Sequence, residues 1–210
     1  MITKDEWDHG VLARNMTSVS QRLASAKVLI AGLGGLGSNI AVMLTRIGIG
    51  RLRLVDFDVV ELSNLNRQHY FLAHLGMPKT DALRAQLLAI NPHLDVETRQ
   101  LRITEDNAGA LAAGCDLVCE AFDQPDAKAM LVTTVLAQVP DVPIVSGSGM
   151  AGYFSSNLVR TERPLRRLYV SGDRVNEPVD GRGLMAPRVL VCAAHQANMI
   201  VRLLMGEHDA

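Results

Sequence analysis

The sequence predicts an α/β fold built on a doubly wound, mostly parallel sheet, with antiparallel strands and a closing helix toward the C-terminus. Short apolar runs alternate with helix-length stretches up to about residue 146, which is how parallel strands and crossover helices follow one another. A glycine-rich turn follows the first apolar run. The chain has 210 residues, 48% of them hydrophobic, which is enough for one packed unit of this kind.

The predicted elements of the first half are, in order, a helix or helix pair at 3–24, a strand at 27–32, a helix at 37–47, a strand at 51–56 and a helix at 78–90. The strands are short apolar runs, as buried parallel strands are. The second helix stops at Gly48, since glycine favours helix ends. The last helix has Pro78 near its first turn, where proline is tolerated, and stops before Pro92.

The second half continues this alternation and then departs from it. The predicted elements are a strand at 94–101, a helix at 104–113 with Thr104 as its N-cap, a strand at 116–121, a helix at 125–139, a strand at 142–146 and a closing helix at 186–205. Residues 150–159 and 165–170 predict strands without a helix between them, so we expect them to pair antiparallel. Residues 171–183 predict a flexible loop over the active-site face.

Composition and charge exclude several classes of protein. The formal net charge is −1, so no basic field draws in nucleic acid and we expect no such partner. No apolar run approaches the roughly 20 residues of a membrane span. The polar first residues hold no signal-peptide core, so we expect a cytoplasmic protein. Three cysteines cannot all pair, which fits a reducing compartment.

The glycine-rich turn at residues 32–37 predicts a Rossmann-like nucleotide site. Gly32, Gly34 and Gly37 match Gly-x-Gly-x-x-Gly between a strand and a helix, where backbone N–H groups bind phosphates. Asp56 ends the next strand about 20 residues later, where a ribose-binding carboxylate is expected. This pattern alone fits an NAD-dependent dehydrogenase as well as an ATP-binding protein.

Polar residues beyond the second strand indicate chemistry at phosphates instead. Arg67 offers a planar, bidentate cation to phosphate oxygens, and Asn64 and Asn66 can orient phosphates or a metal-bound water. Lys79 lies at the start of a helix, where its charge is unfavourable unless an anion lies beside it. Asp123 follows the fourth strand, where a carboxylate beside triphosphate is a natural Mg²⁺ ligand.

Each of these residues also has an ordinary interpretation. In it, Arg67 and Lys79 are solvated surface charges, Asp58 caps a turn, and Asp123 is only the N-cap of the next helix. Their convergence favours the site, because all of them are expected at one edge of one sheet.

The chain resembles the ThiF/MoeB/HesA branch of the ubiquitin-activating-enzyme superfamily over nearly its whole length. The matching stretches are GLGGLGS at 32–38, VDFDVV at 55–60, SNLNRQ at 63–68, GMPK at 76–79, NP at 91–92 and EAFD at 120–123. The stretches SGSGMAGY at 146–153 and GLMAPR at 183–188 are most similar to short ThiF-type sulfur carrier protein adenylyltransferases. The resemblance implies a single ThiF-type adenylation domain over 1–210, with a helical segment at 1–25, a nucleotide-binding core at 26–147, and antiparallel strands, a crossover loop and a C-terminal helix at 148–210.

The resemblance implies an activity. Such enzymes bind Mg-ATP and a ubiquitin-fold sulfur carrier, whose C-terminal Gly-Gly carboxylate attacks the α-phosphate to give an acyl-adenylate and pyrophosphate. By motif match, Arg67 and Lys79 stabilise charge on the phosphates, Asp123 holds Mg²⁺ and Asp56 holds the ribose. The residues implied around the nucleotide are Gly32, Gly34, Gly35, Gly37, Asp56, Asp58, Ser63, Asn64, Leu65, Asn66, Arg67 and Lys79.

The family implies two further features. An arginine near the N-terminus often reaches into the partner's ATP site, which implies a homodimer with Arg14 in this role; the alternative is an exposed helix charge. Many members carry a zinc site of two Cys-x-x-Cys pairs, and several carry a cysteine in the crossover loop. The sequence has neither, so we expect no zinc and no covalent link between carrier and enzyme.

The first hypothesis for the substrate is a ThiS-like carrier, in the sulfur-transfer step that builds the thiamin thiazole. The alternatives with the same chemistry are a MoaD-like carrier of molybdopterin synthesis and a small-molecule or tRNA-linked carboxylate. A different class would be an NAD(P)-binding oxidoreductase or a non-catalytic nucleotide-binding module. The loop at 171–183 either clamps the carrier's tail or is a disordered surface loop.

Overall fold

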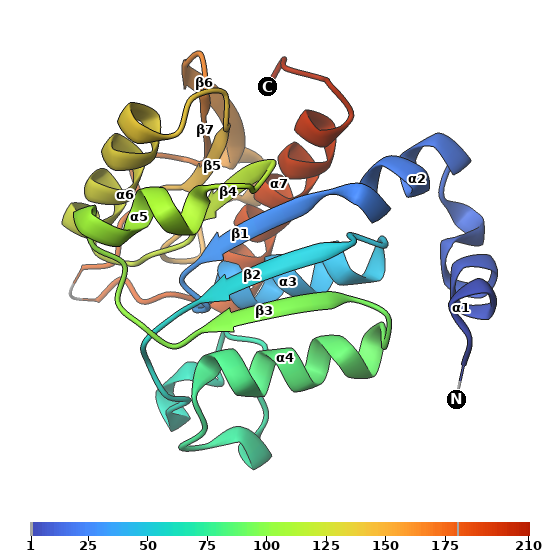
Figure 1. Cartoon of the computed structure of the whole chain (residues 1–210). Coiled ribbons are helices and arrows are strands. Elements are labelled where there is room, and N and C mark those ends of the chain that lie inside the picture. The colour runs from blue at the N-terminus through green and yellow to red at the C-terminus, as the bar shows by residue number, and fades with distance from the viewer. Residues whose placement is uncertain (1, 180) are drawn as a thin grey trace.

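A computed structural model describes residues 2–179 and 181–210. It contains a seven-stranded sheet of order β3-β2-β1-β4-β5-β7-β6 with helices on both faces (Figure 1). The strands are β1 (Lys27–Ala31), β2 (Arg51–Val55), β3 (Asp95–Arg99), β4 (Leu117–Glu120), β5 (Ile144–Gly147), β6 (Arg160–Leu165) and β7 (Leu168–Gly172). The helices are α1 (Lys4–Val11), α2 (Thr17–Ser25), α3 (Gly37–Arg46), α4 (Lys79–Ile90), α5 (Glu105–Ala112), α6 (Pro125–Gln138) and α7 (Ala186–Leu204).

The sheet is parallel apart from one pair. Strand β7 runs parallel to β5, and only β6 is antiparallel to its neighbour among the described strands. The predicted doubly wound α/β fold, its antiparallel pair and its closing helix are therefore confirmed.

The strand order reverses between β1 and β4. The chain runs outward from β1 to β2 and β3, and then returns to β4 on the other side of β1. Ala31 is in register with both Val55 and Glu120, so the carboxyl ends of three strands lie level. Doubly wound sheets bind ligands at such a point, in the crevice beyond the strand ends.

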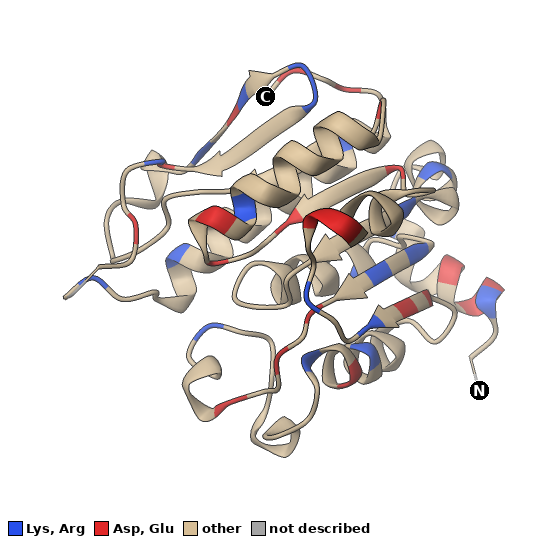
Figure 2. Ribbon diagram, turned by 60° about the vertical axis from the view of Figure 1, so that its left-hand side comes forward, with Lys and Arg blue, Asp and Glu red and all other residues tan. Residues whose placement is uncertain are grey.

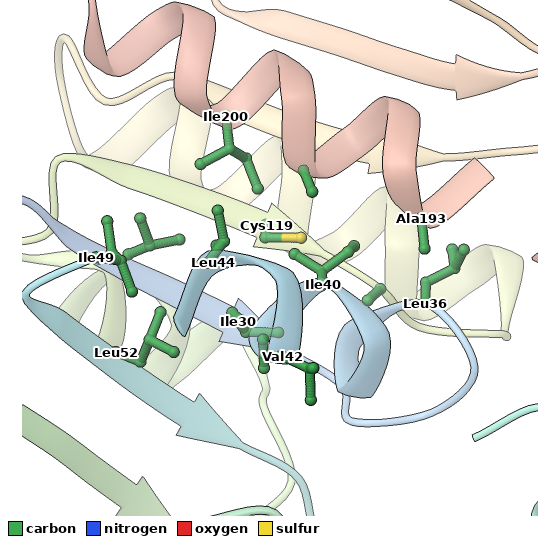
Figure 3. Packing of buried hydrophobic residues seen from close by; sticks show 14 of the residues in the cluster. Ile30, Leu36, Ile40, Val42, Leu44, Ile49, Leu52, Cys119, Ala193 and Ile200 are labelled. Atoms are coloured by element: carbon green, nitrogen blue, oxygen red, sulfur yellow. The ribbon is translucent and has the colours of Figure 1, made fainter. Parts of the chain in front are cut away.

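The central strands alternate between two cores. Ile30 of β1 faces the larger core, with α3, α4 and α7, whereas Leu29 faces the smaller core, with α5 and α6. In the larger core, Ile40 and Leu44 of α3 lie between the sheet and Ile200 of α7 (Figure 3). Full burial of one such side chain contributes roughly 1.5–3 kcal/mol. This seam therefore fixes α3, which begins at the glycine turn, against the C-terminal helix.

The strand predicted at 150–159 is misplaced. Residues 160–165 form β6 instead, and Gly152 has a φ of 75° that an extended strand does not use. The sequence of β6, RTERPL, is polar because the strand lies at the sheet edge, where charges and Pro164 discourage pairing with another chain. The other predicted helices and strands are confirmed, with ends shifted by a few residues.

Helices α1 and α2 lie beyond the amino ends of the strands, at the opposite end of the sheet from the arrowheads (Figure 1). Trp7 anchors α1, because its buried indole N–H donates to the Ile90 carbonyl at 3.1 Å. Basic and acidic residues are distributed over many of the helices, strands and loops (Figure 2). Within the described residues, no helix combines the length and the apolar character that crossing a membrane requires.

Candidate active site

A cavity of about 680 Å³ opens at the carboxyl ends of the central strands. Its volume is within the range of roughly 300–1,000 Å³ that is usual for small-molecule sites. Segments that follow β1, β2, β4 and β5 line it, together with α6 and part of the loop before α7. The predicted site residues that line the cavity are Gly32, Gly34, Gly35, Asp56, Asp58, Arg67, Lys79 and Asp123.

The glycine turn presents unused hydrogen-bond donors to this cavity. The backbone N–H groups of Gly34, Gly35 and Leu36 donate to no other group within 2–179 and 181–210, and helix α3 starts without a side-chain cap. Gly37 lies behind the turn, where a Cβ would meet the Gly32 carbonyl oxygen at 1.9 Å. A helix start with open N–H groups is suited to phosphate oxygens, so the turn fits a nucleotide.

Asp56 holds the turn and the segment after β2 together. Its carboxylate accepts hydrogen bonds from the Leu33 N–H at 2.6 Å and the Asp58 N–H at 2.8 Å. Burial raises the pKa of Asp56, although the Asp58 N–H and the Lys79 charge oppose this. Each carboxylate oxygen has two acceptor positions, so these bonds leave capacity for a ribose hydroxyl.

Lys79 is not a solvated charge. Its side chain is 7% exposed, and its Nζ lies 2.9 Å from Asp58 Oδ2. Its backbone N–H donates to the Asp58 carbonyl at 3.0 Å. The anion beside this lysine at the start of α4 is thus the carboxylate of Asp58, which forms an ion pair rather than a turn cap.

The asparagine-rich segment positions Arg67 rather than lining the cavity. Arg67 Nη1 donates to Asn66 Oδ1 at 2.8 Å and to the Ser63 carbonyl at 3.3 Å. Asn66 Nδ2 in turn donates to the Leu184 carbonyl at 3.1 Å. Asn64 Oδ1 accepts the Glu61 N–H at 3.0 Å. The predicted nucleotide-binding residues that do not line the cavity are Gly37, Ser63, Asn64, Leu65 and Asn66.

Asp123 lies on the cavity wall with an exposed side chain. The carboxylate makes no hydrogen bond or ion pair with any of the described residues, and the N-cap of α6 is Gln124 instead. A free carboxylate that lines the same cavity as the open N–H donors is a suitable ligand for Mg²⁺, which commonly takes one or two carboxylates plus phosphate oxygens.

Arg14 is not brought to this cavity. It ends the 3₁₀ turn Leu12–Arg14 and its side chain is exposed. This turn follows α1, at the other end of the sheet from the cavity (Figure 1). Any contact of Arg14 with such a site would therefore have to involve a second subunit.

Several residues that line the cavity were assigned no role from the sequence. Gln68 ends the SNLNRQ stretch, and its buried Oε1 has no hydrogen-bond partner in the described chain. Lys128 of α6 lines the cavity and pairs with the buried carboxylate of Glu120. The Arg102 guanidinium lies 3.8 Å from the centre of the Phe57 ring. The position of Gln68 within a family motif was an available signal for it. Arg102 and Phe57 are distant in sequence. Lys128 and Glu120 are close in sequence but lie on a helix and a strand whose packing no motif marks.

The predicted loop at 171–183 begins within β7 and then covers part of the cavity, where Glu177 and Pro178 line it. Its first residues are held by Asp173, which accepts the backbone N–H groups of Val175 at 3.0 Å and Asn176 at 2.8 Å. Asp173 also forms a buried ion pair with Arg188 of α7. Asp180 lies outside the described residues.

The sequence comparisons place the chain in one family. The sequence profile of the ThiF family matches residues 11–210. The molybdopterin-synthase adenylyltransferase of Salmonella typhimurium is 34% identical over 191 residues, which are 88% of this chain and 75% of the relative. The tRNA threonylcarbamoyladenosine dehydratase of Bacillus subtilis is 36% identical over 133 residues, 62% of this chain and 52% of that protein. A crystal structure of E. coli tRNA N6-threonylcarbamoyladenosine dehydratase in complex with ATP has a TM-score of 0.86 and 21% identity, and covers 98% of this chain and 97% of its own, which supports the fold.

Proposed function

The chain belongs to the ThiF family, and we propose on this premise that it is an adenylyltransferase that activates a carboxylate with ATP. The observation that carries the proposal is the lining of one cavity by Arg67, Lys79 and Asp123 beside the open N–H donors of the glycine turn. Two cations and a free carboxylate suit chemistry at phosphorus, where positioning and electrostatic stabilisation supply most of the catalysis.

Within this proposal, each group has a definite task. The N–H groups of the glycine turn and the Arg67 guanidinium bind phosphate oxygens. Lys79 stabilises charge that develops as pyrophosphate leaves, and for this it exchanges its partner Asp58 for a phosphate oxygen. Asp56 accepts a hydrogen bond from the ribose. No protein nucleophile is needed, because the substrate supplies its own carboxylate.

Asp123 is the proposed ligand of Mg²⁺. When bound, Mg²⁺ neutralises phosphate charge and polarises the phosphoryl oxygens. The exposed position of the Asp123 carboxylate on the cavity wall leaves it free for this role.

For the substrate, we propose the C-terminal Gly-Gly carboxylate of a ubiquitin-fold sulfur carrier, ThiS-like and used to build the thiamin thiazole. The name of the Salmonella relative, a molybdopterin-synthase adenylyltransferase, supports a MoaD-like carrier as the first alternative. The likeness to the Bacillus subtilis tRNA threonylcarbamoyladenosine dehydratase supports a tRNA-linked carboxylate as a second candidate.

We also propose that two copies associate so that Arg14 of one enters the site of the other. Mixing the inactive variants Arg14→Ala and Lys79→Met tests this, because a mixed dimer regains one intact site. Random pairing restores about a quarter of the sites. No recovery after mixing, or an active protein that is monomeric at assay concentration, contradicts the trans arrangement.

Exchange of labelled pyrophosphate into ATP tests the whole proposal. We expect exchange that depends on a carrier ending in Gly-Gly, with ThiS-like and MoaD-like carriers and threonylcarbamoyladenosine-containing tRNA tried in parallel. Tight NADH binding without ATP binding would contradict it. ATP binding without exchange in any arm would leave a nucleotide-binding module.

A further inference from the structure

Beneath the cavity wall lies a carboxylate to which the proposed chemistry assigns no task. Glu120 is the last residue of β4 and is fully buried. Its Oε1 accepts the Phe122 N–H at 2.6 Å, and its Oε2 accepts the Ser146 hydroxyl at 2.5 Å. Lys128 Nζ lies 3.1 and 3.0 Å from the two oxygens. A buried charge is retained when its donors satisfy it in this way.

These donors belong to three segments of the cavity wall. Phe122 immediately precedes Asp123, Ser146 precedes the lining residues Gly147 and Ser148, and Lys128 lines the cavity from α6. One carboxylate therefore ties the exits of β4 and β5 to the first turns of α6.

The position of Asp123 depends on the hydrogen bonds of Glu120 more than the positions of its neighbours do. Its side chain has no hydrogen bond in the described chain, so no partner holds the carboxylate and its location follows from the backbone position and the side-chain rotamer. Ala121 is held separately, because its N–H donates to the Ala31 carbonyl at 2.9 Å. The hydrogen bond from Phe122 to Glu120 is the next constraint along the chain, one residue before Asp123. The glycine turn packs against the Ala121 backbone, which keeps its own hydrogen bond to Ala31. A Cβ at Gly32 would meet the Ala121 oxygen at 2.9 Å and the Phe122 ring at 3.0 Å.

We propose that Glu120 is a positioning residue that holds Asp123 where it can ligate the Mg²⁺ that accompanies ATP. The inference rests on the proposed adenylyltransferase function. Glu120 acts on the chain after Ala121. Its loss should therefore weaken the gain in nucleotide affinity that Mg²⁺ gives, and leave the metal-independent affinity that the glycine turn supplies. Residues that support a metal ligand typically change metal affinity by 10- to 100-fold when replaced.

The test measures binding rather than turnover. Calorimetry gives the affinity of α,β-methylene-ATP with excess EDTA and with increasing Mg²⁺, for the wild type and for Glu120→Gln. We expect the Mg²⁺ concentration that gives half of the increase in nucleotide affinity to rise about tenfold in Glu120→Gln. The nucleotide affinity in EDTA should change less than about twofold. In pyrophosphate exchange, the same variant should recover with added Mg²⁺.

Glu97→Gln is the matched control. Glu97 also binds several donors, Lys27, Arg53 and Arg99, but it lies on β3 outside the cavity lining. Its loss should leave the Mg²⁺ dependence unchanged. If Glu120→Gln does not fold, Ser146→Ala removes one donor to the same carboxylate and should shift the Mg²⁺ dependence in the same direction.

Two results overturn the inference. One is an unchanged Mg²⁺ dependence in a folded Glu120→Gln or Ser146→Ala variant. The other is an equal loss of affinity in EDTA and in Mg²⁺, which would show a role in the fold only. Failure of the wild type to bind the nucleotide at all would instead contradict the proposed function.

Discussion

The ion pair between Arg188 and Asp173 gives a quantitative test of how the loop over the cavity is held. The two side chains are 3% and 5% exposed, and Arg188 Nη1 also donates to the Ser155 carbonyl at 3.0 Å. Arg188 thus joins the start of α7 to two loop segments. The substitution Arg188→Met removes the charge and both hydrogen bonds and keeps most of the side-chain volume.

The expected cost follows from the partner that is left behind. Removing one member of a buried ion pair costs about 3–5 kcal/mol, because the other charge stays buried without compensation. Asp173 keeps hydrogen bonds from the Val175 and Asn176 N–H groups, so we expect a loss near the lower end, about 3 kcal/mol. At roughly 2–4 °C per kcal/mol for a chain of this length, Tm falls by about 6–12 °C.

Urea unfolding measures this loss. Far-UV circular dichroism is the suitable probe, because the fluorescence of the single tryptophan, Trp7, would report mainly on α1. Arg174→Met is the control: Arg174 lies on the same loop and pairs with Glu162, but its side chain is 51% exposed. We expect Arg174→Met to leave the unfolding midpoint nearly unchanged, as exposed ion pairs usually do.

The double variant Arg188→Met with Asp173→Asn separates the unpaired charge from the lost contacts. If the reasoning holds, the double variant is more stable than Arg188→Met alone, because asparagine keeps acceptor capacity without a charge. A loss below about 1 kcal/mol in Arg188→Met, typical of exposed ion pairs, would refute this reasoning. So would a loss in the double variant that equals the sum of the losses in Arg188→Met and Asp173→Asn.

Three further predictions concern the site and its supports. Arg67→Ala and Asp123→Ala should each lower pyrophosphate exchange by about 10²- to 10³-fold with an unchanged circular dichroism spectrum; normal exchange in both would refute their roles. Gly37→Ala should lower the free energy of unfolding by about 3 kcal/mol or more, because its Cβ would meet the Gly32 oxygen at 1.9 Å, whereas Gly10→Ala, with nothing within 4 Å, should cost nothing. Burial alone would raise the pKa of Asp173, but its hydrogen bonds and the nearby guanidinium hold it below the ordinary value of 3.8, so its contribution to stability is present above that value and is lost as the pH falls further. The urea midpoint of Asp173→Asn should therefore fall less steeply with acid than that of the wild type.

The predictability of the fold follows from how deeply each strand is buried. The stretch 27–32 was predictable because β1 is covered on both faces and every position after Lys27 is buried. Strand β6 was not, because an edge strand exposes most of its side chains. Its polar sequence resembles a loop, while the apolar residues of 150–159 resemble a strand although Gly152 turns the chain there.

The candidate site divides in a similar way. Short motifs contain the glycines of the turn, Asp56, Arg67 and Lys79. These residues could therefore be predicted from the sequence to lie in one site. The pairing of Lys79 with Asp58 and the burial of Glu120 depend on how separate segments pack against one another. The position of Lys79 at a helix start indicated an anionic partner but not which one. Charged residues are rarely buried, so nothing in the sequence marks Glu120 as an exception.

The ion pair of Lys79 with Asp58 has a consequence for anion affinity. An ammonium group in water must shed its hydration shell before it contacts a phosphate, and that shell is a large part of the cost of binding. Lys79, only 7% exposed, has already lost most of its water and holds a carboxylate in its place. Asp58 is 45% exposed, so it can turn outward and regain hydration when it is displaced. An arriving phosphate oxygen thus replaces an internal anion at Lys79, and the displaced Asp58 carboxylate becomes hydrated by bulk water.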